Sequence, residues 1–220
     1  MSNPTDVDFV SVRDEPLHRK QFSNEHVWVY RAGIGAGCSS LFHEHAQDTL
    51  YICLRETKCW NHPCGKPSFL HEAKYGEMWW AMAKADPYVH KVEVPPEENE
   101  TDFVAMEVLE PAPAGASGLC ALPSPFVHLP DLSNHKVTVL KLRLGPGEKA
   151  ESPAWGCSGV LLSLTDGVLS GSEGGPFQAG LEAIGAAKWV EDPAAFSVVN
   201  SGTLTYEALV VQWKSAQHGK

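Results

Sequence analysis

Short apolar runs, separated by clusters of glycine, proline and polar residues, set the pattern of the chain from residue 26 onward. The first such runs are HVWVYRAGI from His26, LYICL from Leu50 and KCW from Lys58. Runs of this length, rich in valine, isoleucine and aromatic residues, are typical of β-strands. Helical spacing is indicated only in GLEAIGAAKW, which starts at Gly180. The pattern therefore predicts an all-β fold.

The first 25 residues differ from the rest because they show no clear period. Within them, only the run DFVSV from Asp8 alternates as an edge strand does. We expect residues 1–25 to form an N-terminal arm that pairs with a sheet edge, either in its own subunit or across a two-fold axis. The apolar cluster Met78, Trp79 and Trp80 is read as core or as an interface.

An internal repeat divides the chain. Residues 27–54 align without a gap on residues 137–164, at an offset of 110 that later shortens to 106. A stretch rich in proline, alanine and glycine, PAPAGASG, lies between the two copies. We therefore expect two β-barrel domains, 26–110 and 136–214, joined by a linker over 111–135.

Composition limits the classes of function. The 220 residues are 43% hydrophobic, with a formal net charge of −10 and a pI near 5.4. Phosphate backbones and anionic membranes are bound through clustered Lys and Arg, so we expect neither nucleic acid nor membrane as a partner. The N-terminus lacks the basic start and apolar core of a signal peptide, which predicts a cytoplasmic location. The six cysteines show no secreted framework and are read as reduced thiols.

Two histidines separated by one residue, His43 and His45, are the strongest candidates for chemistry. On a strand, residues two apart point to the same face. A third histidine, His90, lies in the strand-like run YVHKV. Three neutral imidazoles suit iron, zinc, nickel or copper better than magnesium or calcium. These residues predict one divalent transition metal per chain.

The spacing around these histidines resembles that of the cupin superfamily. Gly37 precedes His43 by the five-residue gap of the cupin motif GxxxxxHxH, and His90 follows at the distance of the second cupin motif. The resemblance implies that the two domains are tandem cupin (jelly-roll) β-barrels, a bicupin, with His43, His45 and His90 as metal ligands. It also makes a homodimer the expected assembly.

Two positions depart from the family pattern. Thr49 or Leu50 stands where most cupins carry a glutamate, and Val94 stands where the second motif ends in asparagine. A subset of cupins carries HxHxxD, which implies Asp48 as an optional fourth ligand. Strand parity turns Asp48 away from the histidines unless a bulge re-aims it. Parity places Tyr51 on their face, as a catalytic hydrogen-bond donor to substrate or a structural tyrosine bonded to backbone.

The second domain has lost every candidate ligand. The positions aligned with His43, His45, Asp48 and His90 hold Pro153, Trp155, Ser158 and Phe196. Proline, tryptophan and phenylalanine side chains offer no lone pair to a metal ion. We expect this domain to be metal-free, with a filled interior.

The run CWNHPC, residues 59–64, is a weaker metal candidate. A structural zinc takes four ligands and usually shows CxxC spacing, so we expect a hairpin loop with incidental thiols. His62, His71, His128 and His135 have no strand partner at ligand spacing and are expected in loops or on the surface.

The resemblance implies a mononuclear metal enzyme, foremost an Fe(II) dioxygenase-like oxidoreductase that acts on a small organic substrate. Two alternatives stay open. One is a redox-neutral lyase or isomerase in which Zn(II) or another divalent ion acts as a Lewis acid. The other is a cupin that binds a small molecule without turnover. Zn, Ni, Mn and Cu stay open as the metal, and the sequence does not identify the substrate.

Overall fold

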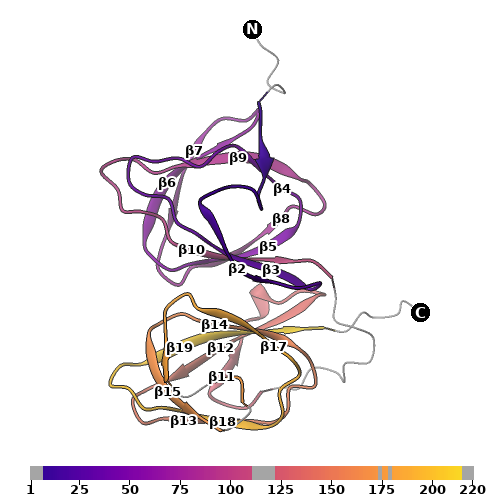
Figure 1. Cartoon of the computed structure of the whole chain (residues 1–220), viewed down its shortest axis with the longest axis vertical. Helices are drawn as coiled ribbons and strands as arrows, with labels where there is room; N and C mark the ends of the chain where they lie inside the picture. Colours follow the sequence, from indigo (N-terminus) through magenta and orange to yellow (C-terminus); the bar gives the residue numbers. More distant parts are fainter. Residues whose placement is uncertain (1–6, 111–121, 173–174, 178–179, 215–220) are drawn as a thin grey trace, which may run out of the picture. The chain divides into compact units, whose positions relative to one another are not determined.

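The computed structural model describes residues 7–110, 122–172, 175–177 and 180–214. The chain forms two compact units, Met1–Leu109 and Glu110–Lys220, which we call unit 1 and unit 2. Both are built from strands, and the described residues include one short 3₁₀ helix, η1 (Pro130–Leu132) (Figure 1). In this part of the chain no helix has the length and apolarity of a membrane span. The all-β prediction is confirmed.

Unit 1 consists of two five-stranded sheets, with the strand orders β1-β4-β9-β6-β7 and β2-β3-β10-β5-β8 (Figure 1). Neighbouring strands are antiparallel, except that β1 and β4 are parallel. The strands are β1 (Val10–Ser11), β2 (His18–Ser23), β3 (Val27–Ala32), β4 (His43–His45), β5 (Asp48–Cys53), β6 (Thr57–Pro63), β7 (Phe69–Ala73), β8 (Met78–Met82), β9 (Tyr88–Glu93) and β10 (Phe103–Val108).

The interior of unit 1 follows from the alternation of its strands. From β3, the side chains of Trp28, Tyr30 and Ala32 pack in one buried cluster with Cys53 and Phe103. Burying one large apolar side chain contributes about 1.5–3 kcal/mol. β10 lies between β3 and β5, and all six of its residues are buried. Tyr51 and Trp79, which belong to the site described below, pack against this cluster.

Unit 1 begins with strands from the segment expected to be a separate arm. β1 pairs with β4, so that Val10 lies opposite His43, while β2 pairs with β3 in the other sheet. The N-terminal segment thus adds to both sheets of its own unit. The sequence shows no clear period here because β1 has only two residues and a register shift between Lys20 and Phe22 interrupts β2.

Unit 2 repeats the arrangement of unit 1. Its sheets have the orders β11-β12-β19-β14-β17 and β13-β18-β15-β16. Strand for strand this is the order of unit 1, and among the described residues only β1 lacks a counterpart. The strands are β11 (Phe126–His128), β12 (Val137–Leu144), β13 (Lys149–Ser152), β14 (Gly159–Ser163), β15 (Gly167–Gly171), β16 (Gly180–Glu182), β17 (Ala187–Val190), β18 (Phe196–Asn200) and β19 (Tyr206–Trp213). The sequence repeat is therefore also a repeat of topology.

Aromatic rings lie in unit 2 where unit 1 places its histidines. Trp155 is fully buried, and its ring centroid is 6.1 Å from that of Phe196. Phe196 pairs with Ser152 across β13 and β18, as His90 pairs with His43 in unit 1. The space between these strands is thus packed with apolar side chains.

Three local expectations differ from the structure. GLEAIGAAKW forms β16 and β17 rather than a helix, because Gly185, with a φ of 78°, makes a turn between them. β11 and η1 lie inside the range expected to be a linker, of which residues 111–121 lie outside the described residues. Residues 59–63 of CWNHPC belong to β6 rather than to a hairpin loop, because β6 pairs with both β7 and β9.

Candidate metal centre

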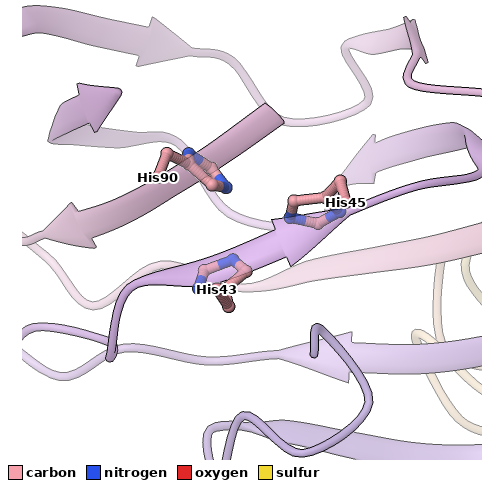
Figure 2. Close-up of side chains that lie close together, drawn as sticks. All are labelled: His43, His45 and His90. Carbon is pink, nitrogen blue, oxygen red and sulfur yellow. The ribbon is translucent and has the colours of Figure 1, made fainter. Parts of the chain in front are cut away.

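Three histidines meet inside unit 1 because β4 and β9 are antiparallel neighbours. His43 lies opposite His90, and His45 follows on the same face of β4. The ring centroids of His43 and His90 are 4.6 Å apart, and that of His45 lies 4.9 and 5.0 Å from them. One ring nitrogen from each residue lies within 4.8 Å of the others. Figure 2 shows the three rings turned toward one another from the two strands.

Hydrogen bonds on the outer side fix the orientation of two rings. His43 donates its Nδ1 proton to the carbonyl oxygen of Leu41 at 2.9 Å, and His90 donates its Nδ1 proton to Oδ1 of Asn61 at 3.0 Å. A neutral imidazole whose Nδ1 carries the proton presents a lone pair at Nε2. Histidine ligands in metalloproteins are held in this way.

The inward nitrogens lack protein partners. Nε2 of His45 and Nε2 of His90 are buried, and neither has a hydrogen-bond partner among the described residues. Buried polar atoms are normally paired, so two unpaired nitrogens in one cluster require an explanation. A divalent transition metal bound by the cluster would satisfy both, and imidazole suits iron, zinc, nickel and copper alike. The residues present therefore fit such an ion.

Burial keeps the three imidazoles neutral. It lowers the pKa of His43 and, together with the neighbouring imidazoles, lowers the pKa of His90 to about 3. The pKa of His45 is likewise lowered by burial, and then by the proximity of His90 and His43. Neutral imidazole is the form that binds metal, so at pH 7 protons do not compete for these nitrogens.

The metal-free protein is expected to lose stability as the pH falls below about 6.5, the ordinary pKa of histidine. Burial holds the pKa of His90 at about 3 and that of His18 at about 4. Between these values and about 6.5 the unfolded chain binds protons that the folded chain does not, so the free energy of unfolding falls with pH. Thermal unfolding of metal-free protein between about pH 7.5 and pH 5 measures this, with His18→Leu expected to flatten the slope. A midpoint that is constant over this range would contradict buried neutral imidazoles.

Tyr51 holds the third ligand. Its hydroxyl oxygen lies 3.2 Å from Nδ1 of His45, where it can accept the Nδ1 proton and leave Nε2 free for a metal. Its ring stacks on Trp79, with centroids 5.4 Å apart and an interplanar angle of 14°. Burial raises the pKa of Tyr51, so the hydroxyl stays neutral. The structure thus places the hydroxyl of Tyr51 within hydrogen-bonding distance of His45, a candidate metal ligand.

Asp48 lies outside the cluster. It begins β5 opposite Met82, and its Oδ1 accepts the backbone N–H of Lys84 at 3.1 Å. The register between β5 and β8 is regular from Asp48 onward, and β5 belongs to the other sheet from the histidine strand β4. The structure therefore gives Asp48 a part in fixing the end of β8 and does not bring it to the three histidines.

A fourth imidazole, His18 on β2, lies beside the cluster and was not found from the sequence. Its ring centroid is 4.8 Å from that of His43 and 4.7 Å from that of Tyr30. Its Nδ1 donates to the carbonyl oxygen of Val12 at 3.1 Å, and burial lowers its pKa to about 4. No local pattern signals this residue, because it reaches the site through the pairing of β2 with β3.

Glu15 ties the N-terminal segment to the metal ligand His43. This carboxylate is 2% exposed, and it accepts the backbone N–H of Leu17 at 2.6 Å and that of Leu41 at 3.2 Å. Leu41 in turn holds Nδ1 of His43 through its carbonyl oxygen. A buried carboxylate thus supports the candidate ligand His43 through one intervening residue, Leu41, as outer-shell groups do in metal sites.

A cavity of about 320 Å³ adjoins the cluster. Imidazoles, aromatic rings and small apolar side chains from both sheets form its wall. The lining residues are His18, Ala32, Ile34, His43, His45, Tyr51, Cys59, Asn61, Phe69, His71, Trp79, Tyr88, His90, Val92, Thr101 and Phe103.

His71 was expected in a loop or on the surface, and this expectation is wrong. It lies on β7 opposite Cys59 and lines the cavity. Its ring centroid is 5.1 Å from that of Trp79, and its Nε2 is buried with no hydrogen-bond partner among the described residues. The pairing of β6 with β7, which the sequence did not reveal, carries it there.

Replacing Asn61 with leucine is expected to weaken metal binding by about 10- to 100-fold, the usual cost of losing an outer-shell partner. The Nδ1 proton of His90 would lose its acceptor, so the ring would no longer be fixed with Nε2 inward. Asn61→Asp keeps an acceptor oxygen and should retain most of the affinity. Competition with a chelator measures both. Equal affinity in wild type and Asn61→Leu would show that this hydrogen bond does not orient the ligand.

No protein-family model and no curated protein matches the sequence. Solved structures do resemble it. A bacterial pirin, YhhW from Escherichia coli in complex with nickel(II), has a TM-score of 0.62 at 15% identity over 90% of this chain and 91% of that one. Salicylate 1,2-dioxygenase from Pseudaminobacter salicylatoxidans has a TM-score of 0.57 at 9% identity, covering 89% of this chain and 75% of its own. A cupin 2 conserved barrel domain protein from Leptotrichia buccalis has a TM-score of 0.52 at 9% identity, covering 97% and 92%.

These likenesses extend over both units, and at such low identity they concern the fold. They agree with the two-sheet topology of each unit. The chain is therefore an all-β protein with the cupin fold.

Proposed function

We propose that unit 1 is a mononuclear metal centre in which His43, His45 and His90 bind one divalent transition metal. The observation that carries this proposal is the pair of buried Nε2 atoms, on His45 and His90, that have no partner among the described residues. Outer hydrogen bonds hold the rings in place before any metal arrives. Such preorganisation lowers the cost of assembling the site.

We further propose that the protein is an oxidoreductase of the dioxygenase type, with iron(II) as the metal and a small organic substrate. Iron(II) held by His43, His45 and His90 would supply the redox chemistry that lets dioxygen react with an organic molecule. The chain contributes a cavity whose wall is formed by imidazoles, aromatic rings and apolar side chains. Tyr51 and Asn61 hold two of the ligands in place.

The absence of charged side chains from the described cavity wall favours dioxygenase chemistry over a redox-neutral reaction. No Asp, Glu, Lys or Arg lines the cavity in the described part of the chain. Burial raises the pKa of Cys59 to about 11 and lowers the pKa of His18 to about 4, so neither group exchanges protons readily near pH 7. A lyase or isomerase would rely on such a group beside its metal, whereas the remaining imidazole of the wall, His71, is separated from the three histidines by Trp79 and Tyr51.

The solved neighbours support the proposal without deciding the reaction, because one fold hosts many chemistries. One of them was solved in complex with nickel(II), and another is a salicylate 1,2-dioxygenase. Metal content of protein purified without added metal, followed by oxygen uptake with a panel of small phenols, acids and thiols, tests the proposal. We expect close to one metal per chain and oxygen uptake with iron(II) but not with zinc(II). Turnover with zinc(II) and no oxygen consumption would point to a lyase or isomerase instead.

A homodimer and a cytoplasmic location stay predictions. Because β1 and β2 belong to the sheets of unit 1, the N-terminal segment is not a free arm for exchange between subunits. We therefore propose that any dimer forms without it. Mass in solution at micromolar concentration, measured for the full chain and after deletion of residues 1–15, tests both points. A monomeric full chain would contradict the dimer, and a dimer lost on deletion would contradict its independence from the segment.

A further inference from the structure

The cavity of unit 1 has an aromatic middle. Trp79 stacks on Tyr51 and meets Phe103 edge to face, with centroids 5.4 and 5.7 Å apart. Phe69 and Ile34 add further apolar surface to the same wall. Flat rings of this kind bind a planar molecule through stacking and edge contacts.

Each end of this apolar middle carries buried nitrogen atoms without a partner among the described residues. At one end these are Nε2 of His45 and of His90, and at the other it is Nε2 of His71. Trp79 lies between the ends, since its ring contacts both His71 and Tyr51, and Tyr51 reaches His45. A metal explains the first end but not His71. Other buried polar atoms of the described residues are also unpaired, but those of His45, His71 and His90 belong to residues that line the cavity, where a bound molecule can pair with them.

Resting on the proposed function, we propose that the cavity binds an uncharged, planar aromatic molecule with two adjacent oxygen atoms at one end and a hydrogen-bonding group at the other. The two oxygens would face the metal held by the three histidines, whose remaining positions are open. The ring would lie against Trp79. The far group would hydrogen-bond to Nε2 of His71.

The absence of charge in the wall selects against acids at the far end. No Lys or Arg lines the cavity in the described part of the chain, so a carboxylate there would be buried without a cation. Burial lowers the pKa of His71, so its ring does not supply that cation at pH 7. A neutral amide, carbonyl or hydroxyl pairs with a neutral imidazole without this cost.

The size of the cavity limits the ligand further. At roughly 30 Å³ for each water molecule in the liquid, a volume of about 320 Å³ corresponds to about ten waters. One ring or two fused rings fit this space.

Three probes that share one ring and one pair of adjacent hydroxyls test the proposal on the full chain loaded with cobalt(II), whose visible absorption reports its ligands. They are 3,4-dihydroxybenzamide, 4-ethylcatechol and 3,4-dihydroxybenzoate. We expect the amide to bind about fivefold more tightly than the ethyl compound, as one neutral hydrogen bond provides. The benzoate should bind most weakly. Benzoate binding as tightly as the amide would overturn the proposal.

Substitutions at His71 test whether this residue causes the preference for the amide over 4-ethylcatechol. His71→Leu should erase the preference for the amide and leave 4-ethylcatechol binding unchanged, whereas His71→Gln should keep it. The matched control is His62→Leu, because His62 bonds to Ser68 at 2.7 Å and does not line the cavity. A preference that survives in His71→Leu would refute the role of His71.

Retention of cobalt(II) distinguishes failure of the proposed metal centre from failure of the proposed ligand class. If the chain does not retain cobalt(II), the metal centre is wrong, and quenching of tryptophan fluorescence that is present in wild type and lost in Trp79→Phe still ranks the three probes. If cobalt(II) is retained but no probe changes its absorption, the metal centre stands and the proposed ligand class is wrong.

Discussion

Replacing His43 with alanine is expected to abolish metal binding, with a loss of affinity larger than the roughly 100-fold that an outer-shell substitution can cost. Of the three ligands, His43 has the most support, because Leu41 holds its Nδ1 and Glu15 holds Leu41. Removing the ring leaves two nitrogens, too few to complete a stable site for a divalent transition metal. Metal content after dialysis, measured by plasma mass spectrometry, should fall from near one per chain to near zero.

The control for this experiment is His62→Ala. His62 lies on β6, the strand next to β9 in the same sheet, bonds to Ser68, and does not belong to the cluster, so its loss should leave metal content unchanged. Full metal occupancy in His43→Ala would disprove the assignment. Loss in both variants would instead indicate general damage to the sheet.

Trp155→Ala is expected to destabilise the protein by about 3–5 kcal/mol while leaving its metal content intact. Trp155 is fully buried in unit 2, where it packs against Phe196. Removing it leaves a cavity that the surrounding strands fill only in part. Thermal and denaturant unfolding measure the loss, and metal analysis of the same sample measures occupancy.

Trp155→Phe is the matched comparison for this prediction. The indole N–H of Trp155 is buried without a hydrogen-bond partner among the described residues, so phenylalanine removes a polar atom while keeping most of the apolar volume. It should cost clearly less than alanine. A fall in metal content in either variant, or a metal bound within residues 137–214, would contradict the division of roles between the two units.

The positions of His43, His45 and His90 could be predicted because they depend on the simplest property of a sheet. A period of two puts His43 and His45 on one face. The antiparallel neighbour then brings His90 opposite His43. The repeat likewise identified Trp155 and Phe196 as replacements, since aligned copies of one unit share a topology.

His18 and His71 could not be predicted because their role depends on which strands become neighbours. His18 reaches the cluster through β2, whose alternation is broken by a register shift after Lys20. His71 reaches the cavity because β7 pairs with β6 across a turn at Gly65, whereas the hairpin loop was expected earlier, over residues 59–64. The helix expected over GLEAIGAAKW is wrong for a different reason. The helix propensity of its alanines is outweighed by the turn at Gly185 and by the pairing of β16 and β17 with neighbouring strands.

X-ray absorption spectroscopy of the zinc(II)-loaded full chain tests the metal centre most directly, because it identifies the donor atoms whatever reaction is catalysed. A site of His43, His45 and His90 predicts nitrogen donors at about 2.0–2.1 Å with the outer-shell scattering of imidazole. That signal should disappear in His43→Ala. Sulfur scattering at about 2.3 Å would contradict the account, because it would place the metal on cysteine thiolates such as those of the CWNHPC run.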